Sequence, residues 1–78
     1  MKIFALDFKT NESGVKKIIV FAEYEKDAKD QCRLISRGLF GFFEDKTEKW
    51  ISDSLCTLVG EAINGTKTGI LAVERARN

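Results

Sequence analysis

The chain has 78 residues, of which 13 are basic and 12 acidic, so its formal net charge is +1. Proteins that bind nucleic-acid backbones accumulate lysine and arginine, and this balance argues against a generic phosphate-backbone binder. The chain contains no proline and 44% of its residues are hydrophobic, which is typical of a globular protein. Its length predicts one domain, residues 1–78. This is close to the smallest size at which a hydrophobic core keeps a domain folded without disulfides or metal ions.

The N-terminal segment does not have the composition of a secretory signal. Its apolar run, residues 3–6, ends at Asp7, whereas a signal peptide needs a longer apolar stretch. No segment approaches the roughly 20 apolar residues of a membrane-spanning helix. We therefore expect a cytoplasmic protein with no membrane partner.

The first half of the chain predicts a hairpin. Residues 2–9 alternate in the manner of a strand, and residues 11–14 contain the Asn and Gly of a tight turn. Residues 18–22 are β-branched, aromatic or small, so they predict a second, antiparallel strand.

This second strand is apolar on both of its faces. Ile18 and Val20 point to one face, and Ile19 and Phe21 point to the other. A sheet that is covered on only one face usually shows alternation instead. We therefore expect that something covers each face of the sheet.

A helix is predicted for residues 25–38. Gly38 has the position of the residue after a C-cap, where glycine is favoured. The apolar stripe of the helix follows i, i+4, i+7 and i+11 spacing and consists of Ala28, Cys32, Ile35 and Leu39.

The second half is less regular. Residues 39–43 are short and aromatic, and they predict a third strand. Residues 47–63 have helical apolar spacing with Thr47 as a cap, but their many poor helix formers favour a strand over residues 55–63. Asn64-Gly65 then predicts a hairpin turn that leads to a last strand over residues 69–73.

These elements together predict the α+β class. The expected architecture is an antiparallel sheet of about five strands, in β-β-α-β-β-β order, with one helix packed on one face. Cys32 and Cys56 are expected to be free thiols, because nothing marks the chain as secreted. Cys32 should be buried between helix and sheet, and Cys56 should be partly shielded within a strand.

The sequence shows no catalytic constellation. It lacks histidine, the commonest general base and metal ligand, and it lacks a metal-type cysteine spacing. Residues 60–68 differ from a phosphate-binding loop, because Thr66 separates Gly65 from Lys67 and a strand is predicted to follow. We expect no enzyme activity, no cofactor and no bound metal.

Half of the eight aromatic residues fall within residues 40–50. One interpretation is a second small core or a dimer seam. The other is a recognition surface, because aromatic side chains anchor protein interfaces and stack on single-stranded bases. The candidate binding residues are the aromatics Phe40, Phe42, Phe43 and Trp50 and the basic residues that could flank them, Lys46, Lys49, Arg33 and Arg37.

Residues 21–23 (Phe-Ala-Glu) and 27–29 (Asp-Ala-Lys) join a predicted hairpin to a helix that begins with Ala-Lys after acidic residues. Over residues 1–50 this pattern resembles very small phage and mobile-element proteins, including anti-CRISPR proteins of β-β-α-β-β order. The predicted terminal hairpin extends beyond the pattern. The resemblance implies a non-enzymatic inhibitor that occupies the surface of a host defence complex in the host cytoplasm, and it assigns no site residues.

The leading functional hypothesis is therefore a small binding protein with a protein partner. The alternative is a single-stranded nucleic-acid-binding module that uses Phe40, Phe42 and Trp50 with nearby lysines. For the second sheet face, we expect self-association as a homodimer or constitutive binding of a partner. The competing explanation is that residues 47–63 form a second helix that covers this face.

Overall fold

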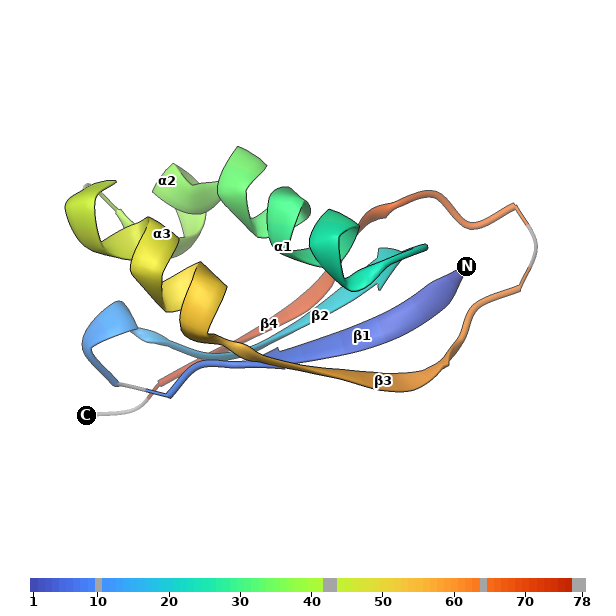
Figure 1. Cartoon of the computed structure of the whole chain (residues 1–78), viewed down its shortest axis with the longest axis horizontal. Helices are drawn as coiled ribbons and strands as arrows, with labels where there is room; N and C mark the ends of the chain where they lie inside the picture. The colour runs from blue at the N-terminus through green and yellow to red at the C-terminus, as the bar shows by residue number, and fades with distance from the viewer. Residues whose placement is uncertain (10, 42–43, 64, 77–78) are drawn as a thin grey trace.

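The computed structural model describes residues 1–9, 11–41, 44–63 and 65–76, and within them it has four strands, three α-helices and one short 3₁₀ turn (Figure 1). The α+β class and the antiparallel sheet are confirmed. The elements in chain order are β1 (Lys2–Asp7), the 3₁₀ turn η1 (Asn11–Ser13), β2 (Val15–Ala22), α1 (Glu25–Leu34), α2 (Ser36–Phe40), α3 (Glu44–Asp53), β3 (Leu55–Glu61) and β4 (Gly69–Arg75).

The four strands pair in the order β3-β1-β2-β4, and all the pairs are antiparallel. The first hairpin is confirmed, with Phe4 opposite Val20. The hairpin predicted at residues 64–65 is wrong, although Asn64 itself lies outside the described residues. The β1–β2 hairpin leaves one edge free on each side; β3 adds to the β1 edge and β4 to the β2 edge, so these two strands lie at opposite sides of the sheet.

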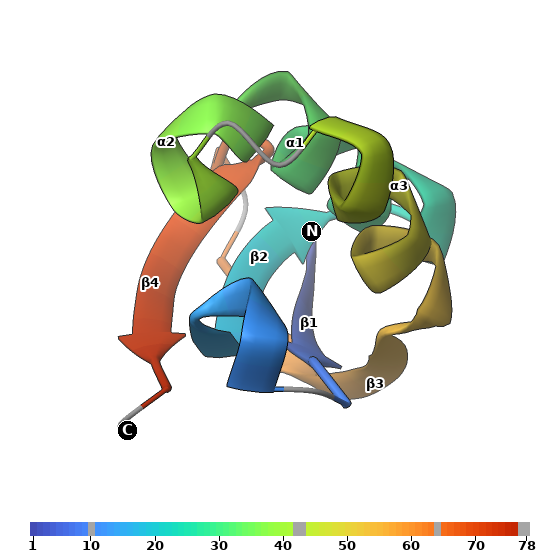
Figure 2. The same ribbon diagram turned by 90° about the vertical axis from the view of Figure 1, so that its left-hand side faces the viewer.

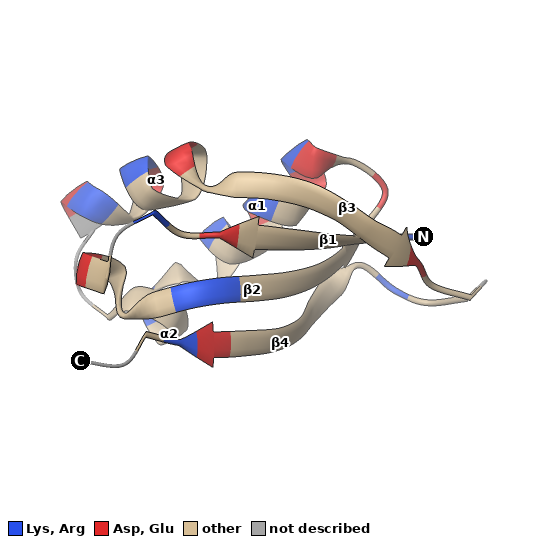
Figure 3. Ribbon diagram, turned by 90° about the horizontal axis from the view of Figure 1, so that it is seen from below, with Lys and Arg blue, Asp and Glu red and all other residues tan. Residues whose placement is uncertain are grey.

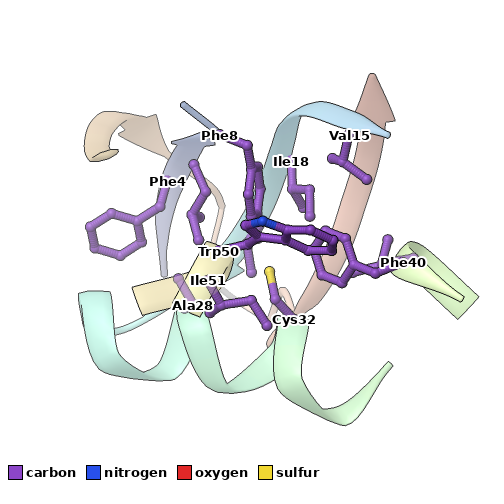
Figure 4. Packing of buried hydrophobic residues seen from close by; sticks show 13 residues of the cluster. Phe4, Phe8, Val15, Ile18, Ala28, Cys32, Phe40, Trp50 and Ile51 are labelled. Carbon is purple, nitrogen blue, oxygen red and sulfur yellow. The ribbon is translucent and has the colours of Figure 1, made fainter. Parts of the chain in front are cut away.

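The helices form one layer on a single face of the sheet (Figures 1 and 2). Their apolar side chains pack against the apolar side chains that β1 and β2 direct toward them (Figure 4). None of the helices in the described part of the chain has the length and apolar content of a membrane span. The fully buried large side chains at the centre of this core are Leu6, Ile18, Ile51, Val15, Val20 and Cys32.

The strand predicted for residues 39–43 is wrong where the structure describes it, because Leu39 and Phe40 end helix α2. Adjacent residues of a strand point to opposite faces, whereas a helix can turn two neighbours toward the same core. Leu39 is 5% exposed and Phe40 is 4% exposed, so the helix buries both. This change and the extra helix α3 replace the expected five strands and one helix with four strands and three helices.

The helix predicted for residues 25–38 is divided in two. Helix α1 ends at Leu34, and Ile35 has φ −112° and ψ 22° between α1 and α2. Gly38 therefore lies inside α2, and it is Gly41, with φ 75°, that follows the last helical residue. Ile35, which was expected on the apolar stripe, is 43% exposed.

Residues 47–63 contain both of the predicted alternatives in succession. Helix α3 ends where Ser54 donates its backbone N–H and its hydroxyl to the carbonyl of Ile51, at 3.2 and 2.6 Å. Strand β3 begins at the next residue, so the favoured strand over residues 55–63 is confirmed for Leu55–Glu61. Helix α3 packs beside α1 on the same face of the sheet (Figure 2), so it does not cover the other face.

The register of β3 with β1 shifts once, and the register of β4 with β2 shifts twice, once at Lys16 of β2 and once at Leu71 of β4. Val59 on β3 has no partner in the register with β1, and Leu71 on β4 has none in the register with β2. Each of these side chains is 56% exposed. Such bulges bend the strand locally and increase its twist.

Candidate binding surface

Two of the four residues in the predicted aromatic cluster, Phe40 and Trp50, lie in the core. Phe40 is 4% exposed and Trp50 is 7% exposed. Their ring centroids are 5.8 Å apart, and the Phe40 ring is 5.5 Å from that of Phe8 (Figure 4). These separations are those of tilted aromatic pairs that stabilise a core. Phe42 and Phe43 lie outside the described residues.

The basic residue Arg33 connects two helices. Its Nε donates to Glu48 on α3 at 2.8 Å, and its Nη1 donates to Asp30 at 2.8 Å. The hydrogen bond from Arg33 is the main cause that lowers the pKa of Glu48 and that of Asp30. The guanidinium is thus engaged in holding α1 against α3, whereas Arg37, also proposed for binding, is exposed on α2.

Three of the predicted site residues do come together. Lys46, Lys49 and Trp50 line a cavity of about 420 Å³ between α3 and the end of β1, together with Phe8, Lys9, Glu12 and Asp53. Lys46 pairs with Glu12, and Lys49 donates to Asp53 at 2.8 Å. These pairings compensate most of the charge around the cavity, so they give no set of unmatched cations for an anionic ligand.

The other face of the sheet is different. In β1 and β2 the residues that alternate with the buried core positions point away from the helices, and the registers extend this face over β3 and β4. We call it the open face. It consists of three rows across the sheet: Leu55, Asp7, Lys17 and Glu74; Thr57, Ala5, Ile19 and Ala72; and Gly60, Ile3, Phe21 and Gly69.

No helix of the described residues packs on the open face, which Figure 3 shows from below the sheet. The central side chains Ile3, Ile19 and Phe21 are half-buried by their neighbours within the sheet. For example, the Cδ1 atom of Ile3 lies 3.7 Å from where a Cβ on Gly60 would stand. Leu55 is 60% exposed, so the apolar surface reaches the edge strand.

Charge gathers in the first row of the open face. The Nζ of Lys17 lies 3.7 Å from Asp7 Oδ1, and the two side chains are 40% and 44% exposed. Beside them, the Nζ of Lys16 on β2 lies 3.8 Å from Oε1 of Glu74 on the edge strand β4. The other two rows contain no charged residue, as the uniform tan of the sheet centre in Figure 3 shows.

The sequence analysis indicated this face through Ile19 and Phe21, but it gave β3 and β4 no part in a surface. A signal was present, because residues 69–73 are apolar on both faces of their strand just as residues 18–22 are. What could not be seen is that β3 and β4 flank the central hairpin and widen the same face.

Burial opposes the ionisation of both cysteines. Both cysteines are free, as predicted. Burial raises the pKa of Cys32 and of Cys56 to about 11, so each is a thiol at neutral pH rather than a nucleophilic thiolate. Among the described residues no group of three or more potential ligand side chains could hold a metal ion.

Comparison with known proteins adds no assignment. No protein-family model matches the chain, no curated protein matches it, and no solved structure matches it.

Proposed function

We propose that this chain is a small non-enzymatic binding protein that acts through the open face of its sheet, with a protein surface as its ligand. The observation that supports this proposal is an apolar sheet face on which no helix of the described residues packs. Contiguous apolar patches on monomers are usually small, and larger ones mark interaction sites. Protein interfaces have an apolar centre and a polar rim, and the open face has an apolar centre with charges in one outer row.

A protein ligand has more support than a nucleic acid. The single-strand hypothesis needs exposed aromatic rings for stacking, and the Phe40 and Trp50 side chains are buried. On the open face the charged row has Lys17 beside Asp7 and Glu74, which is not the run of positive charge that follows a phosphate backbone. The occlusion of a host defence complex, which the resemblance implies, is the biological extension of this proposal.

The experiment compares two lysine substitutions of the same residue type. Ile19→Lys places a charge in the middle of the open face, and Ile35→Lys places one on the helix layer, where the side chain is already 43% exposed. The wild-type chain and both variants are immobilised. Each is exposed first to a lysate of cells that express the wild-type chain and then, in a separate assay, to the purified wild-type chain. We expect Ile19→Lys to lose the bound protein and Ile35→Lys to keep it.

A second variant guards against a folding defect. Thr57→Lys lies in the same row as Ile19 on the exposed strand β3, and it removes no core contact. Circular dichroism and urea unfolding establish that each variant is folded. Bound protein that is the same for wild type, Ile19→Lys and Thr57→Lys would contradict the proposal.

A further inference from the structure

We infer that the occupant of the open face is a second copy of this chain, so that two sheets pack face to face about a two-fold axis parallel to β1 and β2. This inference rests on the proposed function, because it names the protein that the face binds. It goes further by fixing which residues meet across the interface.

The order of the strands defines the pairing. An axis that runs between the two sheets, midway between β1 and β2, places β1 over β2 of the second copy. It also places β3 over β4. Strand directions stay aligned in this arrangement, as in sandwiches whose sheets pack about 10 Å apart at about 30°. Because the sheets twist, the central strands keep the closest register.

The two central positions of the charged row are complementary under this rotation, and at the exposed margins Glu74 lies over Leu55 of the second copy. Asp7 of one copy lies over Lys17 of the second copy, and Lys17 lies over Asp7. Both side chains are partly exposed and their separation within one chain is 3.7 Å, so they can be shared between copies. Opposite charges thus meet twice in the dimer, which favours this register over others.

The central apolar row is complementary in size, and the third row brings two large apolar side chains together. Rotation places Ile19 over Ala5 of the second copy, and Phe21 over Ile3. A large side chain therefore faces a small one in the central row, which allows the two surfaces to interdigitate. The flanking positions of the third row are glycines, Gly60 and Gly69, so nothing there keeps the sheets apart.

The other two-fold axis in the plane between the sheets fits poorly. An axis perpendicular to the strands places the row of Asp7 and Lys17 over the row of Ile3 and Phe21. Charges would then be buried against apolar side chains without partners, which is costly. Of these two axes, the one parallel to the strands brings Asp7 and Lys17 of the two copies together, and a foreign partner would not require this property.

The size of the face sets the expected affinity. Four strands of about seven residues make a face of about 20 by 20 Å. That is the low end of specific interfaces, where association is weak or transient. We therefore expect a dimer with a dissociation constant in the micromolar range.

The test uses sedimentation and light scattering of the purified full chain from about 5 to 500 μM, a range that brackets such an affinity. The wild type is expected to pass from monomer to dimer. Asp7→Lys puts like charges over each other twice, so we expect its dissociation constant to rise about tenfold or more. Lys17→Asp should have the same effect.

Mixing the two variants is the decisive step. An introduced lysine at position 7 then faces an introduced aspartate at position 17, and Lys17 of one chain faces Asp7 of the other. We expect dimers to return in the equimolar mixture, and native mass spectrometry should identify them as mixed dimers, since the two chains differ in mass. The intrachain pair stays broken in both variants, so its loss cannot explain a recovery.

A matched control uses an ion pair on the helix side of the sheet, away from the open face. Glu12 and Lys46 form an ion pair beside α3, and reversing their charges with Glu12→Lys or Lys46→Glu should leave the dissociation constant of the dimer unchanged. A dimer that ignores the substitutions at Asp7 and Lys17 would overturn the inference and indicate pairing through the edge strands.

A wild type that stays monomeric at 500 μM would also overturn the inference. A different result would contradict the proposed function. If such a monomer still captures a protein that Ile19→Lys loses, the open face is a binding surface with a foreign partner. If the capture is also indifferent to Ile19→Lys, both proposals fall.

Discussion

The two faces of the sheet differ in what covers them more than in what they are made of. On β2, Ile18 and Val20 are fully buried beneath the helices, while Ile19 and Phe21, their immediate neighbours, are only half-buried by the sheet itself. Both faces are apolar at their centre. The apolar composition of a strand therefore predicts that a sheet face is buried. It does not predict whether the same chain or another molecule buries it.

The three helices of the described residues are not divided between the two faces of the sheet. They are instead gathered on one face, because short connections keep them together: a single residue, Ile35, separates α1 from α2. The ion pair between Arg33 and Glu48 then fixes α1 against α3. All the helices of the described chain therefore lie on the covered face, and none is left for the open face.

The sharpest way to test this contrast is to shorten two adjacent isoleucines. Ile18→Ala removes a fully buried side chain and leaves a cavity, so we expect a loss of about 3 kcal/mol in the free energy of unfolding. Ile19→Ala leaves no closed cavity, and we expect it to cost the monomer less than about 1 kcal/mol. Urea unfolding at low micromolar concentration, followed by the fluorescence of the single tryptophan, Trp50, measures both.

Repeating the measurement at high concentration sharpens the comparison. Dimer formation adds to the stability of the wild type as concentration rises, and Ile19→Ala should lose part of that gain. Equal losses for the two variants at low concentration would show that the open face is covered within one chain.

A smaller effect separates two glycines of the helix layer. Gly41 has φ 75° and ψ −143°, a conformation that is costly for any other residue, so Gly41→Ala should lower the free energy of unfolding by about 1–2 kcal/mol. Gly38 lies within α2 with open space around an added Cβ. Gly38→Ala should therefore raise the free energy by about 0.5–1 kcal/mol.

The same urea experiment gives both values. A loss at Gly38 together with no loss at Gly41 would place the end of the helix at Gly38, as the sequence alone suggested. Neither substitution touches the open face, so the dimer dissociation constant should not change.

The smallest effect concerns the ion pair that joins α1 and α3. The hydrogen bond from Arg33 lowers the pKa of Glu48 in the folded state, so this pair contributes stability above the ordinary pKa of 4.5 and loses it as the pH falls through the lower folded value. Glu48→Gln should thus be slightly less stable than the wild type at pH 7, with a difference that disappears in acid. The effect is small because the Glu48 side chain is exposed.

Unfolding curves of both chains at neutral and acidic pH check this, and high salt should reduce the neutral-pH difference by screening. A difference that persists at the lowest pH would assign the effect of the substitution to helix propensity instead of charge.

The elements that the sequence predicts well are those whose signals are local. The alternation of β1 and β2 around the turn at residues 11–14, and the start of α1 at Glu25, depend on residues close in the chain. The predicted hairpin at residues 64–65 is wrong because β3 and β4 do not pair with each other. Strand β3 pairs with the free edge of β1, and β4 pairs with the free edge of β2. That information is tertiary and is absent from the local pattern.

The candidate site shows the same division. Phe40 and Trp50 could be recognised as a cluster, but which side of α2 and α3 faces the sheet depends on helix ends that the sequence misplaced. Ile19 and Phe21 could be recognised as a second apolar face, since strand alternation needs no tertiary information. Whether a homodimer or another protein covers that face stays a prediction.

The bulges at Val59 and Leu71 also bear on solubility. A regular edge strand can recruit a strand from another molecule, and each addition leaves a new edge, so that growth continues into fibrils. A bulge interrupts the repeat of donors and acceptors that a recruited strand would need. Because β3 and β4 each contain one, both ends of the sheet are poor templates for polymerisation, even though neither strand has a proline or lysine to protect it.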